Sequence, residues 1–240
     1  MVVFTGTPCQ VAGVNSYFKL KKKKPILIDF VCHGVGNHEI FTEYLDSLNR
    51  KNNNVTNYSF REKQIKNGNL LDYCSTISYQ NGRIRLVDMD VYVQAFLNQL
   101  TNRESCQDNC MFRHKERLSD FTIGDFRNVH YLICGTKYRN RNYSMIVVNS
   151  DFANNLIHRI KMGGDCLECN LDNIIQVNPL FDGQEKNNQN RYDFHEYRKK
   201  YGTKKALNKY RTLRFSLKRK IALGLSPKFK RVIKKILHKK

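Results

Sequence analysis

Two cysteines occupy turns that follow an apolar stretch typical of a strand and precede a stretch typical of a helix. Cys9 comes shortly after residues 2–5, and Cys32 comes directly after residues 26–31. The N–H groups and the dipole of the helix that follows Cys9 favour its thiolate form. Cysteines in such positions indicate redox or cluster chemistry.

A second pair of thiols, Cys106 and Cys110, lies in one later segment. An iron-sulfur cluster takes four cysteine thiolates, and the two pairs together supply that number from three segments. A tetrahedral zinc site is an alternative, because cysteine ligation alone does not select the metal. Another is that Cys9 and Cys32 are small buried apolar side chains, since cysteine is among the residue types most often buried. The candidate metal ligands are Cys9, Cys32, Cys106 and Cys110.

The order of the elements predicts an α/β fold, a mixed β-sheet flanked by helices. The apolar stretches 2–5 and 26–31 are each followed by a helical pattern, which makes the two strands parallel. Further on, Asn81 and Gly82 separate two strand-like stretches and predict an antiparallel hairpin with a type I′ turn. Strands joined in both ways give a mixed sheet.

The composition indicates a cytoplasmic protein. The 240 residues are 40% hydrophobic, which is enough for one sizeable core, and we expect one domain with an appended segment. Eight cysteines without an apolar leader segment indicate a reducing compartment, where thiols serve metals, clusters or cores. No stretch approaches the roughly 18 to 20 apolar residues of a membrane span. We expect the protein in the cytoplasm, in solution or peripheral to the inner face of the membrane.

The net charge of +21 is concentrated at one end of the chain. Residues 198–240 contain 18 Lys and Arg and no Asp or Glu, so the other 24 basic and 21 acidic side chains leave residues 1–197 at +3. The tail therefore carries the charge that selects a partner. We expect an α/β domain over residues 1–180, a polar linker over 181–197 and a basic helical tail over 198–240.

Residues 226–240 predict a basic amphipathic helix. Ser226 and Pro227 suit its start, and apolar side chains then recur at helical spacing with Lys and Arg between them. Such helices bind anionic bilayers, where each basic residue near the surface contributes about 1 kcal/mol. Packing on the body or on a partner is the alternative; nucleic acid is disfavoured, because no base-stacking aromatic residues are interleaved with the basic ones. The candidate contacts are Phe229, Lys230, Arg231, Val232, Ile233, Lys234, Lys235, Ile236 and Leu237.

Five segments occur in an order typical of a known family. They are residues 4–13, 29–35, 60–63, 105–112 and 119–126. Together they resemble the C-terminal domain of the coenzyme F420 hydrogenase/dehydrogenase beta-subunit family over residues 1 to about 150. The resemblance implies an oxidoreductase that passes electrons between a 4Fe-4S cluster, a flavin such as FAD, and a soluble hydride carrier, the deazaflavin coenzyme F420.

The resemblance also has implications for partners. Family members often carry an N-terminal ferredoxin-like domain with two cysteine-rich motifs, which is not found in these residues, so we expect a ferredoxin-like domain or protein as partner. Bacterial relatives resemble proteins of polysaccharide-synthesis clusters. The family usually has Cys-x-x-Cys in its third segment, whereas Cys106 and Cys110 are separated by three residues.

A flavin phosphate would suit the turns before the first two helices, where backbone N–H groups point outward. Neither turn is a complete dinucleotide fingerprint, and paired glycines also occur in ordinary turns. An aspartate that closes a later strand could orient a ligand or cap a loop. The candidate cofactor-binding residues are Gly6, Thr7, Pro8, His33, Gly34 and Asp125.

Two classes of function are consistent with the sequence. One is an electron-transfer oxidoreductase module with a cluster and a flavin. The other is a non-catalytic binding module that contacts an anionic membrane surface or a partner through its tail. Visible absorption distinguishes them, because a cluster or a flavin is coloured.

We predict that removal of residues 226–240 abolishes binding to anionic vesicles and leaves any cofactor absorption unchanged. The deletion removes five apolar side chains of the predicted helix and seven Lys and Arg side chains. Co-sedimentation with vesicles measures the effect, and binding of the full chain should weaken with salt, since the screening length at roughly 0.15 M is about 8 Å. Equal sedimentation of the truncated and full chains contradicts a membrane role for the tail.

Overall fold

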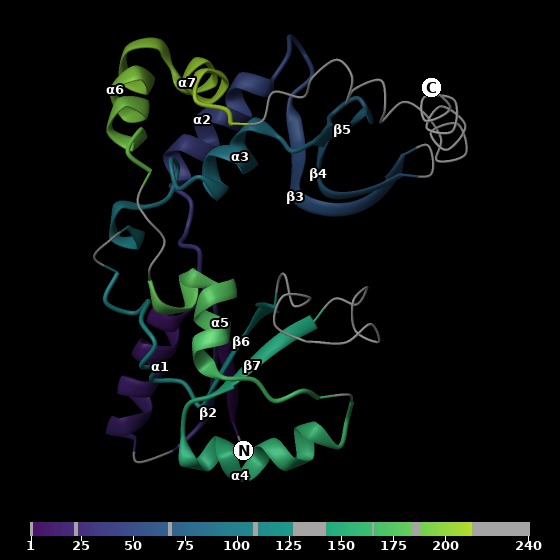
Figure 1. The fold of residues 1–240 in the computed structure, drawn as a ribbon. Helices are drawn as coiled ribbons and strands as arrows, with labels where there is room; N and C mark the ends of the chain where they lie inside the picture. The colour runs from purple at the N-terminus through teal and green to yellow at the C-terminus, as the bar shows by residue number, and fades with distance from the viewer. Residues whose placement is uncertain are drawn as a thin grey trace, which may run out of the picture. The chain divides into compact units, whose positions relative to one another are not determined.

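The structure, a computed structural model, divides the chain into two compact units (Figure 1). Unit 1 comprises Met1–Gly34 and Glu104–Lys186, and unit 2 comprises Val35–Arg103 and Asn187–Lys240. The residues that the structure describes are 2–21, 24–66, 69–107, 110–126, 143–164, 166–183 and 188–212. The sequence led us to expect one domain up to residue 180. Two units form because the residues after 34 build an aromatic core of their own with the helices after 187.

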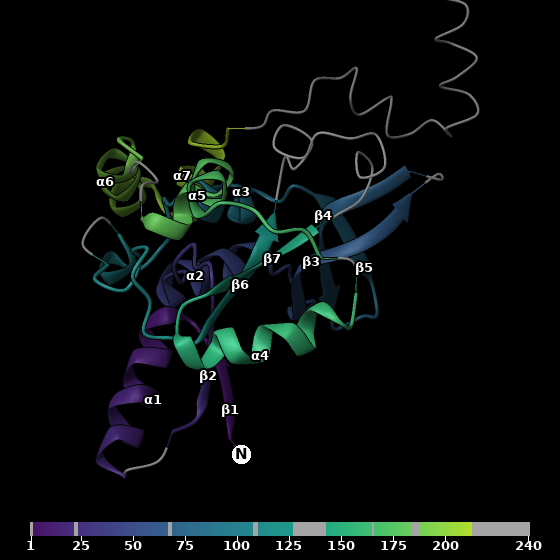
Figure 2. The same ribbon diagram turned by 60° about the horizontal axis from the view of Figure 1, so that its bottom comes forward.

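Unit 1 contains a mixed sheet, as predicted. Its strands are β1 (Val3–Gly6), β2 (Ile26–Phe30), β6 (Phe121–Phe126) and β7 (Tyr143–Val148), in the order β1-β2-β6-β7. The first three strands are parallel and β7 is antiparallel to β6, so the prediction that the first two strands are parallel neighbours is confirmed. Its helices are α1 (Pro8–Leu20), η1 (Glu104–Cys106), α4 (Asp151–Lys161), α5 (Leu171–Val177) and η4 (Pro179–Asp182). Helix α1 packs on β1 and β2 (Figure 2).

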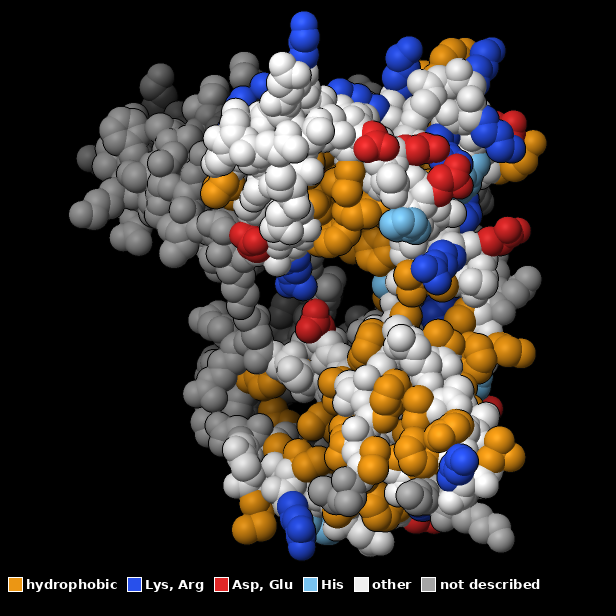
Figure 3. Space-filling view, turned by 180° about the vertical axis from the view of Figure 1, so that it is seen from behind, with side chains coloured by type: hydrophobic (Ala, Val, Ile, Leu, Met, Phe, Trp, Pro, Cys, Tyr) orange, Lys and Arg blue, Asp and Glu red, His pale blue; other side chains and the backbone are white. Residues whose placement is uncertain are grey.

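The two faces of this sheet differ in how they are covered. On one face, the buried side chains of Phe126 and Met145 pack with Phe181 of η4. On the other face, the register partners Ile123 and Ile146 are 37% and 41% exposed. The view from behind shows many apolar side chains at the surface of unit 1 (Figure 3).

Asp120 has a structural role at the start of β6. It is 6% exposed, its Oδ2 accepts the N–H of Leu27 at 2.9 Å, and its Oδ1 accepts the hydroxyl of Ser150 at 2.6 Å. Ser150 is in turn the N-cap of α4 and accepts the N–H of Ala153. The carboxylate thus connects β6 to β2 and to the start of α4.

Unit 2 contains a separate antiparallel sheet, so the prediction that the hairpin strands lie in the mixed sheet is wrong. Its strands are β3 (Val55–Lys66), β4 (Asn69–Tyr79) and β5 (Ile84–Asp88), in the order β3-β4-β5. Its helices are α2 (His38–Leu48), α3 (Val91–Leu97), α6 (Arg191–Tyr201) and α7 (Thr203–Lys209). Helix α6 begins inside the stretch 181–197 that the sequence predicts to be a linker.

The predicted hairpin between β4 and β5 is confirmed, but its turn type is wrong. Of the two central residues expected to have positive φ, only Gly82 does, at 77°. The N–H of Tyr79 donates to the carbonyl of Arg83, which leaves a three-residue loop whose last residue is the left-handed glycine. The side-chain oxygen of Asn81 accepts the N–H of Arg83, and the backbone N–H of Asn81 donates to Asn53 Oδ1. Both groups are thus bonded without a positive φ at Asn81.

The first part of the basic tail belongs to the core of unit 2. Ala206 and Leu207 of α7 are at most 1% exposed and cluster with Phe194 of α6 and with Ile40 of α2. Arg198 donates to Glu43 at 2.8 Å. Packing on the body thus holds for residues 198–212, whereas the predicted helix 226–240 and its nine candidate contacts lie outside the described residues.

We predict that Leu207→Ala lowers the free energy of unfolding by about 2–5 kcal/mol, because a buried leucine is replaced by a cavity. Leu20→Ala is the matched control, since Leu20 is 83% exposed and should change stability by no more than about 0.5 kcal/mol. Urea unfolding of both variants measures the difference. Equal effects would mean that α7 does not pack in the core.

We predict that His195 makes unit 2 less stable as the pH falls below about 6.5. Burial lowers the pKa of His195, and the cations of Arg191, Arg198 and Lys199 lower it further. The unfolded chain therefore binds the proton first, so stability is full above the unfolded pKa and falls as the pH drops toward the folded pKa.

The dependence of the unfolding free energy on pH measures this effect. In urea titrations between pH 5 and 6.5, His195→Asn should remove up to about 1.4 kcal/mol per pH unit from the dependence of the unfolding free energy on pH. His38→Asn is the control because His38 is exposed. An unchanged slope in His195→Asn contradicts the prediction.

Candidate cysteine site

The first two candidate thiols come from one edge of the sheet of unit 1. β1 and β2 are parallel neighbours with Gly6 paired to Asp29, so their carboxyl ends lie side by side. Cys9 is in the first turn of α1, and Cys32 is two residues beyond the end of β2. Cys9 is exposed and Cys32 is half-buried. Ligands of open α/β sheets typically bind beyond this edge.

The third segment folds as a series of tight turns. Cys106 is the last residue of η1. The N–H of Cys110 donates to the carbonyl of Gln107 at 3.1 Å. Arg113 then donates its N–H to the carbonyl of Cys110, also at 3.1 Å. Both thiols are half-buried. Backbone hydrogen bonds thus link Cys110 to Gln107 and to Arg113, and the sequence has one residue more between Cys106 and Cys110 than the family pattern.

Electrostatics couples these segments. Burial raises the pKa of the Cys32 thiol, and the charges that Cys106 and Cys9 can carry raise it further. The N–H of Gly34, 3.4 Å from Cys32 Sγ, and the cation of Arg113 act in the opposite direction. Thiols from all three segments thus lie within electrostatic range, and all belong to unit 1.

The distance between sulfur ligands depends on the metal group that they bind. Within the described part of the chain, no three His, Cys, Asp or Glu side chains are placed to hold one metal ion. A tetrahedral zinc ion would bring its sulfur ligands to about 4 Å from one another, given bonds of roughly 2.3 Å. In a four-iron cluster each thiolate binds a different iron, so the sulfur atoms are further apart. Ligation by these four cysteines remains a prediction.

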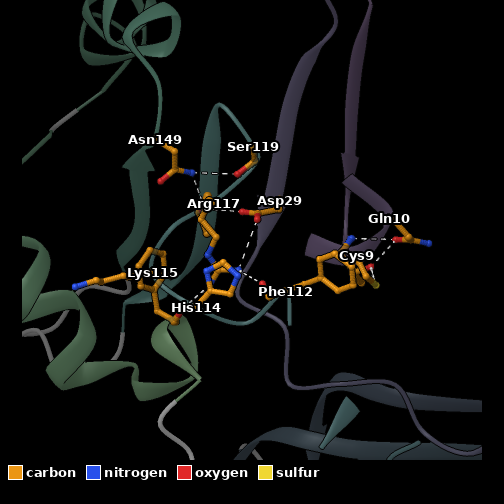
Figure 4. A network of polar contacts seen from close by, with 12 residues as sticks. Cys9, Gln10, Asp29, Phe112, His114, Lys115, Arg117, Ser119 and Asn149 are labelled. Atoms are coloured by element: carbon orange, nitrogen blue, oxygen red, sulfur yellow. Dashed lines mark hydrogen bonds and ion pairs between the residues drawn. The ribbon is translucent and has the colours of Figure 1, made fainter. Parts of the chain in front are cut away.

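A buried ion pair lies next to this site (Figure 4). Asp29 Oδ2 and Arg117 Nη1 are 3.6 Å apart, and both side chains are 1% exposed. The hydroxyl of Thr122 donates to Asp29 Oδ1 at 2.5 Å and accepts the side-chain N–H of Asn149 at 2.9 Å. Burial raises the pKa of Asp29, whereas Thr122 and Arg117 lower it. Hydrogen bonds and the cation thus offset part of the cost of burying the carboxylate.

Arg117 and Arg113 connect the cysteine loop to the core. Arg117 donates to the carbonyls of Phe112 and Phe181, and its guanidinium carbon lies 4.7 Å from the centre of the Phe181 ring. Arg113 donates from Nη2 to the carbonyls of Cys106 and Gln107, each at 2.9 Å. The sequence analysis did not select these arginines. The residue that could have pointed to them is Asp29, because a carboxylate within an apolar strand requires a cation or a hydrogen-bond donor when it is buried.

The predicted phosphate-binding turns are largely bonded within the chain. Pro8 has no N–H, and the N–H of Thr7 donates to Gln10 Oε1 at 2.9 Å. The Thr7 hydroxyl lies 3.1 Å from Cys9 Sγ. The N–H of Gly34 points to Cys32. These two N–H groups are thus bonded within the chain, and flavin binding by the two turns stays a prediction.

The remaining two candidates also show no such cradle. His33 is half-buried beside Cys32. Asp125 is exposed near the end of β6, and its carbonyl accepts the side chain of Asn178 at 3.3 Å. The structure does not assign either side chain to a ligand.

The fold and the site define an α/β protein that presents thiols beyond the carboxyl edge of two parallel strands. Residues 1–173 match the family model that describes the C terminus of the coenzyme F420 hydrogenase/dehydrogenase beta subunit, and the chain belongs to this family. No curated protein matches the chain. None of the described helices combines the length and the apolar character needed to cross a bilayer.

We predict that Asp29→Ala destabilises the protein by about 3–5 kcal/mol, because it removes the ion-pair partner of the buried guanidinium of Arg117. Asp46→Ala is the control, since Asp46 is exposed on α2 and should change stability by no more than about 0.5 kcal/mol. Thermal and urea unfolding measure both. A loss in Asp29→Ala as small as the control's would show that the pair does not hold unit 1 together.

Proposed function

We propose that this chain is an electron-transfer module of an oxidoreductase, with a 4Fe-4S cluster held by Cys9, Cys32, Cys106 and Cys110. The observation that carries the proposal is that Cys9 and Cys32 follow the neighbouring carboxyl ends of β1 and β2, in the same unit as Cys106 and Cys110. Membership of the beta-subunit family supports the same class of function.

The chain's own residues supply binding and orientation. The four cysteines provide thiolate ligands, the first turn of α1 orients Cys9, and Gly34 donates an N–H toward Cys32 at 3.4 Å. Such an N–H stabilises negative charge on sulfur. A bound cluster would supply one-electron transfer.

The proposal extends to the electron partners. A flavin, a soluble hydride carrier such as the deazaflavin coenzyme F420, and a ferredoxin-like domain or protein are the exchange partners that the family suggests. A link to polysaccharide biosynthesis belongs to the same proposal.

A binding function of the tail is the second candidate. The concentration of 18 basic and no acidic residues in 198–240 favours it. An anionic membrane surface is the partner that this charge and the predicted apolar stripe of residues 226–240 would fit.

We predict that anaerobic reconstitution with iron and sulfide loads about four of each per chain and gives charge-transfer absorption in the visible range. Cys32→Ser and Cys106→Ser should each lose most of the bound iron, because a ligand is removed. Iron and sulfide assays and absorption spectra measure the outcome.

Cys166→Ser is the matched control for these variants. Cys166 is an exposed free cysteine of the same unit, so its replacement should leave the iron content unchanged. A wild-type chain that binds no iron, or a loss in Cys166→Ser equal to that in Cys32→Ser, refutes the cluster assignment.

A further inference from the structure

We propose that Arg113 and Arg117 are positioning residues of the cysteine site, which hold the Cys106–Cys110 loop and stabilise the negative charge of the group that the thiolates bind. The inference rests on the proposed cluster function and concerns two side chains that are not ligands.

The first step is the geometry of Arg113. Its two side-chain hydrogen bonds of 2.9 Å each go to backbone carbonyls of the cysteine loop, those of Cys106 and Gln107. A planar guanidinium can donate two bonds from one end in fixed directions, which a flexible ammonium reproduces less well. Arg113 therefore fixes the backbone that carries Cys106.

The second step is charge. Arg113 is 8% exposed and forms no ion pair with a carboxylate of the described residues, and the Arg117 side chain is 1% exposed with Asp29 3.6 Å away. The carboxylates of Asp29 and Asp182 both act on Arg117, so Arg113 is the buried cation of the two that has no ion-pair partner among the described residues. Burying a charge without a counter-charge is costly, so the site favours a further negative charge nearby.

The third step is where that negative charge would lie. The cation of Arg113 acts on the Cys32 thiol, and the charges of Asp29, Cys32, Asp182 and Cys110 act on Arg117. In the described part of the chain, Nε of each arginine is buried without a hydrogen-bond partner. Because Arg113 is bonded to the backbone carbonyl of Cys106, the nearby thiols can supply the counter-charge that it lacks, as thiolates bound to a cluster.

The expected consequence is a shift of the reduction potential. Reduction adds one electron from an electrode, and no bond forms or breaks. A nearby cation stabilises the reduced, more negative cluster. In Arg113→Gln the ratio of reduced to oxidised cluster at a fixed potential should fall at least tenfold, which is about 59 mV for a one-electron couple.

Arg113→Lys separates charge from geometry. The lysine keeps the cation but loses the two fixed hydrogen bonds. The ratio of reduced to oxidised cluster at a fixed potential should therefore change less than tenfold, whereas a chelator should remove iron at least threefold faster than from the wild type. Arg159→Gln is the matched control: Arg159 is exposed on α4 of the same unit, and both its potential and its iron release should equal those of the wild type.

The measurements are spectroelectrochemical titration and iron release to a chelator, on the full chain reconstituted anaerobically, with thermal unfolding as a check of folding. A wild-type chain that takes up no iron overturns the proposed function and this inference together. A loaded wild type with unchanged potential in Arg113→Gln overturns the inference alone. Should Arg113→Gln fail to fold, wild-type iron release in Arg113→Lys overturns the inference.

Discussion

The buried contact between Asp29 and Arg117 is the interaction on which the arrangement of unit 1 depends. It joins a central strand to the loop that carries two of the four candidate thiols, 88 positions further along the chain, with both side chains 1% exposed. Removal of one partner of such a pair leaves an uncompensated charge, which costs more than the intact pair contributes. Thr122 and the ring and carbonyl of Phe181 complete the surroundings of the pair. The loop is thus held on the sheet by polar contacts that work only when all partners are present.

Unit 2 depends on a different principle, an aromatic core around one carboxylate. Tyr44 donates its hydroxyl to Asp90, at 2.8 and 2.7 Å from the two oxygens, and stacks on Tyr92 with ring centres 5.6 Å apart. Burial raises the pKa of Tyr44, and the charge of Asp90 raises it further, so the phenol remains a donor. The helices after residue 187 close this core. Seven of the 18 basic residues of the tail lie in the described segment 198–212, and the helices of this segment pack on the aromatic core.

These features divide the chain's chemistry between its parts. The four candidate thiols, Arg113 and Arg117 belong to unit 1, which lies almost wholly within the family match over residues 1–173. The strongly basic residues belong to the end of the chain. The proposed redox centre and the proposed contact surface of the tail share no side chain, so each can be altered without the other.

The sequence by itself determined the local elements and the placement of the thiols. The two apolar stretches 2–5 and 26–31 formed parallel strands because crossover through a helix allows little else. The hairpin at Gly82 also followed from local chemistry, although its turn type did not, since the contact of Asn81 with Asn53 comes from a segment 28 residues away. Motif order was sufficient to identify the family.

Only the tertiary structure decided which distant residues complete the site and the cores. The arginines beside the thiols have no local pattern, because an ion pair such as that of Arg117 with Asp29 depends on how the chain returns to the sheet. The same holds for Leu207, which the sequence places in a basic tail and the structure places in a core. Local sequence fixes backbone conformation through short-range sterics and hydrogen bonds, whereas burial is set by contacts between segments that are far apart in the chain.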